Sequence, residues 1–211
     1  MTPERKPLFL LADSSLLFWR SGGTLFLERL RTLTGPGPMR AAYLGASNGD
    51  EPAFFDIFTA AMEGVGITAC RMIPSRPTAE DRGWLDAAHV ILLAGGDPLR
   101  GWRTFEENGV AHVLRERYFS GAVLMGISAG AMQLASQAWS ESEPRLFPTL
   151  GLVPFLVSVH EPEGWPALKA ALRAAGEGTR GIGIPWGGGA LVHPDGTVEA
   201  VRHPLVELRY P

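Results

Sequence analysis

Cysteine is almost absent from this chain of 211 residues, since Cys70 is the only one. A single cysteine excludes an internal disulfide, and no group of cysteines and histidines has the spacing of a zinc site. Cys70 lies within residues 67–73, a run of strand-like character. We therefore expect Cys70 to be a buried structural thiol.

Long hydrophobic runs and an excess of basic residues are also lacking. No apolar stretch approaches the roughly 20 residues that a membrane-spanning helix needs, so we expect no membrane partner. The net charge is −3 and no run of basic residues occurs, which argues against a nucleic-acid partner.

The N-terminal region lacks a convincing signal peptide. Arg5 and Lys6 precede an apolar run over residues 7–12, but residues 13–15 interrupt that run and no small-residue cleavage site follows. We interpret residues 8–12 as the first core strand and expect a cytoplasmic protein.

The length and composition favour one domain over residues 1–211. Hydrophobic residues make up 45% and charged residues 19%, the balance of an ordinary soluble globular protein. Apolar runs of strand character alternate with segments of helical periodicity. Strands are expected over residues 8–12, 40–44, 67–73, 90–93, the run that ends at 127, 152–160, 181–185, 189–193 and 197–201. Residues 16–33 have near-helical spacing of apolar residues, with Gly22-Gly23 as a loop just before the helix, and further helices are expected over residues 52–65, 104–118, a segment from 131, and 165–175.

This alternation predicts an α/β fold with a mostly parallel sheet and helices on both faces, because parallel strands need crossover connections. In such sheets ligands bind beyond the carboxyl ends of the strands. Three polar or glycine-rich segments follow predicted strands: Ser47-Asn48, Gly95-Gly96-Asp97 and Ser128. We expect these segments to converge, with Asp97 among the substrate-binding residues.

The sharpest of these strand ends carries a serine. Residues 121–133 read GAVLMGISAGAMQ, in which a buried-strand pattern passes through Gly126 to Gly130 directly into a helix pattern. A Gly-x-Ser-x-Gly between strand and helix is typical of a nucleophile elbow, where the glycines leave room for a strained turn and the hydroxyl of Ser128 stands clear of the sheet. The alternative is a glycine-rich turn whose serine only caps the helix.

A serine hydroxyl becomes a useful nucleophile only beside a base, usually a histidine that a carboxylate orients. His160 follows an apolar strand and begins the irregular residues 160–164, so we expect it at a strand end facing a cleft. We predict His160 as the base. The other histidines lie in less suitable places, at the start of a strand, within a helix pattern or in the C-terminal strand region: His89, His112, His193 and His203.

The residues alone leave the orienting carboxylate open. Two glutamates lie in the polar loop between the serine and His160, and two lie directly after His160. The four candidates are Glu141, Glu143, Glu161 and Glu163.

An acyl-transfer site also needs backbone N–H groups that stabilise the developing oxyanion. The elbow supplies the N–H of Ala129, the residue after the serine. Gly95-Gly96 could supply a second donor, since glycine lets the backbone approach a ligand closely. The alternative is a plain strand-to-helix turn, and the segment lacks the lysine and spacing of a phosphate-binding P-loop.

In combination these segments resemble the dipeptidase E and cyanophycinase family of serine peptidases. The resemblance rests on AGGD at 94–97, GISAGA at 126–131, LGLVP at 150–154 leading to His160, and GIGIP at 181–185. Order and rough spacing match from about Arg40 to Val201. The resemblance implies a class I glutamine-amidotransferase-like fold, a three-layer αβα sandwich, with serine where the amidotransferases have cysteine.

The resemblance also implies the roles of the site residues and the absence of any metal or other cofactor. We therefore expect a serine peptidase that hydrolyses dipeptides or short peptides through an acyl-enzyme, and a homodimer would suit such a sandwich. The implied roles are Ser128 as nucleophile, His160 as base, Gly96 and Ala129 as oxyanion donors, and Glu141 or Glu143 as the third member, with Glu143 favoured by its distance from the serine.

The chain departs from the family pattern at several positions. The loop between Ser128 and His160 is shorter than usual, Asp97 replaces an asparagine, residues 165–173 lack an arginine-rich segment thought to select aspartate, and Trp186 stands where an acidic residue is usual. Catalysis is thus expected to carry over better than specificity for Asp-X. The alternatives are cyanophycinase-like or isoaspartyl hydrolysis, or a catalytically disabled binding protein of the same fold.

Overall fold

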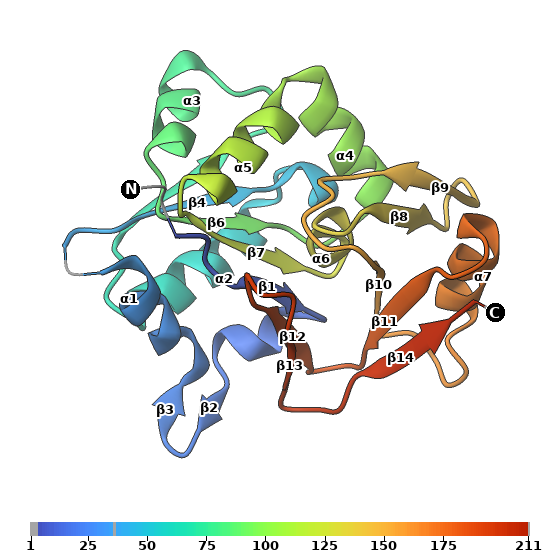
Figure 1. Cartoon of the computed structure of the whole chain (residues 1–211). Coiled ribbons are helices and arrows are strands. Elements are labelled where there is room, and N and C mark those ends of the chain that lie inside the picture. Colours follow the sequence, from blue (N-terminus) through green and yellow to red (C-terminus); the bar gives the residue numbers. More distant parts are fainter. Residues whose placement is uncertain (1–3, 36, 211) are drawn as a thin grey trace.

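A computed structural model describes residues 4–35 and 37–210 of the chain (Figure 1). Its centre is a seven-stranded sheet in the order β13-β12-β1-β7-β6-β4-β5. The strands β1, β7, β6, β4 and β5 run parallel to one another, whereas β12 pairs antiparallel with both β1 and β13, so the predicted mostly parallel sheet is confirmed. The strands are β1 (Leu8–Leu11), β4 (Arg40–Leu44), β5 (Ala69–Ile73), β6 (Val90–Leu93), β7 (Val123–Ile127), β12 (Gly189–Val192) and β13 (Val198–Val201).

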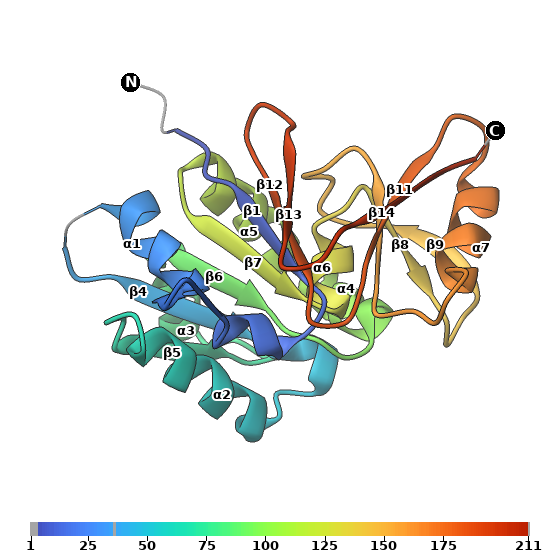
Figure 2. The ribbon, with the colours of Figure 1, turned by 90° about the horizontal axis from the view of Figure 1, so that it is seen from below.

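Helices cover both faces of this sheet, because successive side chains of each strand point to opposite sides. In β1, Leu8 and Leu10 pack in one core cluster and Phe9 and Leu11 in another. The first cluster includes side chains of α3 (Ala79–Asp86), α4 (Pro98–Glu107), α5 (Val110–Phe119) and α6 (Ala129–Gln133), and the second includes those of α1 (Arg29–Thr34) and α2 (Pro52–Glu63). Figures 1 and 2 show the two groups on opposite faces, which confirms the αβα sandwich.

A second group of elements lies beyond the ends of β6 and β7, toward which the arrows of these strands point in both views (Figures 1 and 2). It contains a three-stranded sheet in the order β10-β11-β14, a hairpin of β8 and β9, and one helix. The sequence did not predict β8, β9, β14 or α3. The bounds are β8 (Gln137–Ser140), β9 (Arg145–Pro148), β10 (Leu156–Val159), α7 (Pro166–Ala175), β11 (Arg180–Ile184) and β14 (Val206–Arg209).

Two predicted helices are wrong in their extent. Residues 16–33 form a short hairpin, β2 (Arg20–Ser21) and β3 (Thr24–Leu25), between two 3-10 turns, Ser14–Leu17 and Phe26–Glu28, and only the end of the segment enters α1. The hairpin turns at Gly22 and Gly23, whose φ angles of 58° and 87° suit glycine. The helix predicted over 104–118 is two helices, α4 and α5, because Gly109 at φ 70° interrupts the helical backbone.

Cys70 lies on β5 and is partly rather than fully buried. Burial, together with the nearby Glu63 carboxylate, raises the pKa of its thiol to about 11. The thiol is therefore protonated at neutral pH, as expected for a structural cysteine. Within the described residues, no helix has both the length and the apolar character that crossing a membrane demands.

Candidate active site

Ser128 sits at a strained corner between β7 and α6. Its φ and ψ are 51° and −112°, outside the regions that L-residues normally occupy. A Cβ at Gly126 would lie 2.3 Å from the Gly130 carbonyl carbon, and a Cβ at Gly130 would lie 2.1 Å from the Leu93 carbonyl oxygen. The two glycines are thus required for the turn, as the motif predicts.

The backbone of Ser128 is tied to its surroundings while its side chain is not used for capping. The amide donates to the Leu11 carbonyl at 2.9 Å, and the carbonyl accepts from Ala131 and Met132 at the start of α6. The hydroxyl makes no capping hydrogen bond to the helix. The alternative interpretation, in which the Ser128 side chain only caps the helix, is therefore wrong.

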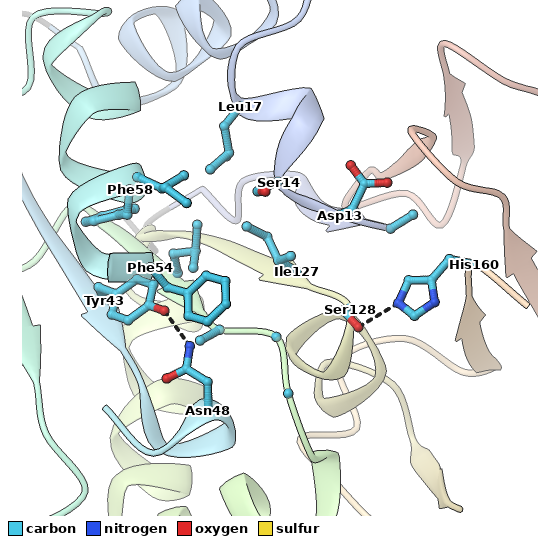
Figure 3. Close-up of a pocket in the computed structure, with 16 residues that line it drawn as sticks. Asp13, Ser14, Leu17, Tyr43, Asn48, Phe54, Phe58, Ile127, Ser128 and His160 are labelled. Carbon is cyan, nitrogen blue, oxygen red and sulfur yellow. Dashed lines mark hydrogen bonds between the residues drawn. The ribbon is translucent and has the colours of Figure 1, made fainter. Parts of the chain in front are cut away.

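His160 comes to Ser128 from the second sheet, directly after β10. Its Nε2 lies 2.8 Å from the Ser128 Oγ (Figure 3). The backbone of His160 has a φ of 43°, and its amide donates to the Ile184 carbonyl at 2.8 Å. The imidazole also stacks on the Trp186 indole, with ring centroids 4.4 Å apart. Two predicted residues far apart in the sequence are thus brought together.

Asp13, which the sequence did not single out, lies beside this pair after β1. Its carboxylate accepts the amide of Ser15 at 2.8 Å and the amide of Gly187 at 2.6 Å. Burial alone would raise the pKa of this carboxyl, but the hydrogen bonds from Ser15 and Gly187, with the nearby His160, bring the pKa below its ordinary value. Asp13 is therefore ionised at neutral pH and holds the turn that carries Trp186.

The glycines after β6 pass directly by the serine. A Cβ on Gly95 would lie 3.3 Å from the Ser128 Cβ, and Gly96 has a φ of 128°. The amide of Asp97 donates to the Ser47 carbonyl at 2.9 Å, whereas within the described residues the amide of Gly96 donates to no group. Gly96 and Ala129 both line the same cavity as Ser128, where the sequence expects the two oxyanion donors.

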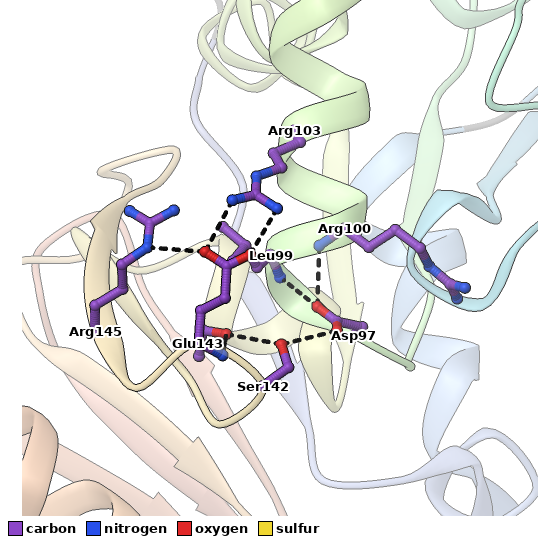
Figure 4. Close-up of polar contacts among 8 residues, drawn as sticks. Asp97, Leu99, Arg100, Arg103, Ser142, Glu143 and Arg145 are labelled. Atoms are coloured by element: carbon purple, nitrogen blue, oxygen red, sulfur yellow. Dashed lines mark hydrogen bonds and ion pairs between the residues drawn. The ribbon is translucent and has the colours of Figure 1, made fainter.

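Glu143, the favoured third member, is engaged elsewhere. Its two carboxylate oxygens accept from Arg103 at 2.8 and 2.9 Å, and one also accepts from Arg145 at 3.3 Å (Figure 4). These ion pairs hold the pKa of Glu143 below its ordinary value. Glu143 lines a separate hollow with Arg103 rather than the cavities at His160, so the structure does not bring it to the imidazole.

The other carboxylate candidates differ in their surroundings. Glu161 accepts the amides of Ala167 and Leu168 at 2.6 and 2.8 Å and so caps α7. Glu141 is exposed but lines a cavity together with Ser128 and His160. Glu163 is exposed on the loop after His160. Of the two glutamates that the family pattern favours, Glu141 is the one in the cavity of the Ser–His pair.

Asp97, which we expected to contact the substrate, also has a structural role that the sequence did not predict. Its carboxylate accepts the amides of Leu99 and Arg100, both at 2.9 Å, and caps α4, while the hydroxyl of Ser142 donates to its other oxygen at 3.2 Å (Figure 4). Asp97 also lines the cavity that contains Ser128. The carboxylate thus faces the site but is largely occupied by the helix end.

Two cavities meet at the Ser–His pair. The first, of about 240 Å³, has a largely apolar lining that includes Tyr43, Phe58 and Ile127. The second, of about 530 Å³, has a more polar lining that includes Glu141 and Ser158. Both include Ser128 and His160 in their walls, so a molecule in either cavity would reach the hydroxyl.

Fold and site together define an αβα sandwich protein with a serine at a nucleophile elbow. A model of Peptidase family S51 matches residues 27–196, and the chain belongs to this family. The resemblance to the dipeptidase E family that the motifs indicate is thereby confirmed, and the protein is a member of a peptidase family.

Solved structures share this fold at low sequence identity. A peptidase from an acI-B1 Actinobacterium is 17% identical, with 99% of this chain and 96% of that chain covered and a TM-score of 0.71. A peptidase E protein from Listeria monocytogenes EGD-e is 14% identical, with 98% and 100% covered and a TM-score of 0.64. A comparison with curated protein sequences gave no match. At these identities the two structures show the fold alone.

Proposed function

We propose that this chain is a serine peptidase that hydrolyses dipeptides or short peptides through an acyl-enzyme. The observation that carries the proposal is the hydrogen bond of 2.8 Å between the Ser128 Oγ and the His160 Nε2 at a strained elbow. Nucleophile and base within hydrogen-bond reach are the signature of an activated serine. The membership of a peptidase family directs this chemistry to peptide bonds.

In the proposed reaction the imidazole of His160 takes up and gives back one proton in each of two stages. The Ser128 Oγ attacks the scissile carbonyl carbon while the His160 Nε2 takes the hydroxyl proton. The imidazolium then gives that proton to the leaving amine as the carbon–nitrogen bond breaks and the acyl-enzyme forms. A water molecule, deprotonated by the same imidazole, then attacks the ester carbonyl. The ester carbon–oxygen bond breaks, the imidazolium returns the proton to the Ser128 Oγ, and the acid is released.

The backbone amides of Gly96 and Ala129 are the proposed oxyanion donors. They flank the serine in the same cavity wall, and loss of one such donor costs a typical enzyme about 3 kcal/mol of transition-state stabilisation. A short substrate suits the space, because both cavities are small. The cavity of about 240 Å³ lies below the range usual for small-molecule sites, and the cavity of about 530 Å³ lies in the lower part of that range.

The test compares wild type with Ser128→Ala and His160→Ala on a panel of dipeptides. Each variant should lose at least about a thousandfold in kcat, as removal of a nucleophile or base does in related chemistry. A fluorophosphonate probe should label wild type at Ser128, seen by peptide mass spectrometry, and label His160→Ala far more slowly. Retention of activity by Ser128→Ala would rule out the proposal.

Two controls separate the alternatives within the fold. A β-linked Asp-Arg dipeptide, run beside α-linked dipeptides, tests cyanophycinase-like or isoaspartyl hydrolysis. A folded wild type that neither reacts with the probe nor cleaves any peptide would instead be a disabled binding protein. The melting temperature of each variant should match that of wild type, which shows that lost activity is not lost folding.

A further inference from the structure

The smaller cavity at Ser128 has an apolar wall supplied by α2. Phe54, Ile57 and Phe58 stand at positions i, i+3 and i+4 of this helix, so they share one face, and all three line the cavity. Figure 3 shows Phe54 and Phe58 on this wall. Phe58 is buried in the core, at 1% exposure. Leu17 and Ile127 complete the apolar lining.

The rim of the cavity leaves large apolar side chains in solvent. Phe54 is 50% exposed and Ile57 is 36% exposed, both among the few large hydrophobic residues that the described chain leaves open. Exposed apolar surface that lines a concavity next to a reactive group is typical of a ligand site. An apolar group placed there would cover both side chains.

The charges around this cavity disfavour an acidic group. Among the described residues that line it, the one carboxylate is Asp13, and no lysine or arginine contributes. The low pKa of Asp13 keeps it negative at neutral pH. An aspartate side chain in this cavity would lose its hydration, meet no cation and face a like charge, which is costly.

We infer that this cavity binds a large apolar side chain of the peptide, phenylalanine or leucine, on one side of the scissile bond. The inference deepens the proposed function and rests on it, because the cavity selects a substrate only if Ser128 attacks one. The volume of about 240 Å³ fits a single side chain rather than a longer peptide segment. Selection thus depends on the apolar face of α2 and excludes aspartate at this position.

Two matched dipeptide series test the selection. The series X-Ala and Ala-X, with X as phenylalanine, leucine or aspartate, present each side chain on either side of the scissile bond. In one series kcat/KM should be at least about tenfold higher for phenylalanine and leucine than for aspartate, the size of effect that apolar pockets give. Aspartate equal to or better than leucine in both series would overturn the inference.

Phe54→Ala identifies the cavity as the origin of the preference. In this variant the ratio of kcat/KM for the preferred phenylalanine dipeptide to that for its aspartate counterpart should fall at least about fivefold, since much of the apolar rim is lost. Phe119→Ala is the matched control, because Phe119 is 51% exposed at the end of α5 and lines neither cavity at Ser128. An unchanged preference in Phe54→Ala, at an unchanged melting temperature, would contradict the inference while leaving the serine peptidase intact.

Binding to Ser128→Ala separates this inference from the proposed function. Calorimetry on this variant should show tighter binding of the preferred phenylalanine dipeptide than of its aspartate counterpart, and Phe54→Ala in the same background should remove the difference. Such binding without any wild-type hydrolysis would refute the peptidase and keep the apolar site. Equal binding of both dipeptides would refute the apolar site.

Discussion

The imidazole of His160 and the indole of Trp186 lie face to face, with ring centroids 4.4 Å apart and an angle of 26° between the ring planes. The stack covers one face of the imidazole, while its Nε2 is directed at Ser128. Trp186 itself is 64% exposed, so the contact is not explained by burial of the indole in the core. We therefore predict that Trp186 is a positioning residue, which restrains the ring of the proposed base through this stack.

Replacement of Trp186 by alanine should lower kcat by between about tenfold and a hundredfold, because a small displacement of a base from its nucleophile has effects of this size. Trp186→Phe keeps a ring over the imidazole and should recover most of the rate. The measurement is kcat and KM for one dipeptide, together with the rate of fluorophosphonate labelling, which should fall in parallel with kcat.

The melting temperature of Trp186→Ala should stay close to that of wild type, since the side chain is mostly exposed. A change confined to KM would mean that Trp186 contacts substrate instead of positioning the base. Equal rates in the alanine and phenylalanine variants would refute a role for the aromatic ring.

Asp13 secures the turn on which Trp186 stands, so its ionisation should contribute to stability. Its pKa in the folded protein is lowered, which means that folding favours the charged carboxylate. The contribution is fully present above the unfolded pKa of about 3.9 and is lost as the pH falls through the lower folded pKa. An asparagine has one acceptor oxygen where the carboxylate has two, so in Asp13→Asn one of the Ser15 and Gly187 amides loses its acceptor, and the variant should be destabilised at pH 7 by about 1 kcal/mol or more.

Urea unfolding at pH 7, 5 and 3 measures this difference. The gap between wild type and Asp13→Asn should be the same at pH 7 and 5 and narrower at pH 3. Asp86→Asn, at an exposed position at the end of α3, controls for the loss of one negative charge. A gap that widens in acid would show that Asp13 does not act as a carboxylate.

The parts of the site that the sequence predicted are those whose conformation is determined by residues nearby in the chain. The elbow at Ser128 depends on glycines within two residues of it, and Gly95-Gly96 follows directly from the end of β6. His160 could be placed because it follows an apolar strand. These features depend on neighbours in the chain, and a periodic pattern reports such neighbours well.

The parts that the sequence missed depend on contacts between distant segments. Asp13 and Gly187 are 174 positions apart, and no spacing rule connects them. The presence of Trp186 at a usually acidic position was visible as a departure from the family pattern, but its stack on His160 requires the pairing of β10 with β11, which brings the ends of these two strands together. The ion pair between Glu143 and Arg103 could not be predicted for the same reason, because Arg103 comes from α4, far away in the sequence.

Glutamine substitutions should distinguish the two loop glutamates. Glu143→Gln should leave kcat within about twofold of wild type, since the Glu143 carboxylate is paired with Arg103 and Arg145 and lines neither cavity at His160. Glu141→Gln should lower kcat/KM by about tenfold, because Glu141 faces the cavity of the Ser–His pair and an electrostatic contact there is worth about 1.4 kcal/mol per factor of ten.

Steady-state kinetics of both variants on the same dipeptide shows which of the two glutamates contributes to the reaction. The two residues are two positions apart in one exposed loop, so each variant is a control for the other. The opposite pattern, with activity lost in Glu143→Gln alone, would mean that Glu143 acts on the site through the loop. Loss in neither variant would leave the imidazole without an orienting glutamate from this loop.

Substitution of alanine for the glycines around Ser128 should separate effects on the stability of the fold from effects on the rate of the reaction. In Gly130→Ala the new Cβ would meet the Leu93 carbonyl oxygen, part of the β6 backbone, at 2.1 Å, so destabilisation should reach or exceed the roughly 1–3 kcal/mol of an overpacked core. In Gly83→Ala, on the exposed side of α3, the Cβ would meet nothing within 4 Å. That control should gain about 0.4–1 kcal/mol.

Gly95→Ala is the informative intermediate case. Its Cβ would lie 3.3 Å from the Ser128 Cβ, which is tight but not prohibitive, so the variant should fold with a melting temperature near that of wild type. Because the added methyl group presses on the serine side chain, kcat should fall about tenfold or more, as expected when a nucleophile is displaced from its base. A folded Gly95→Ala enzyme with the full rate would mean that the close passage of Gly95 by Ser128 has no part in the reaction.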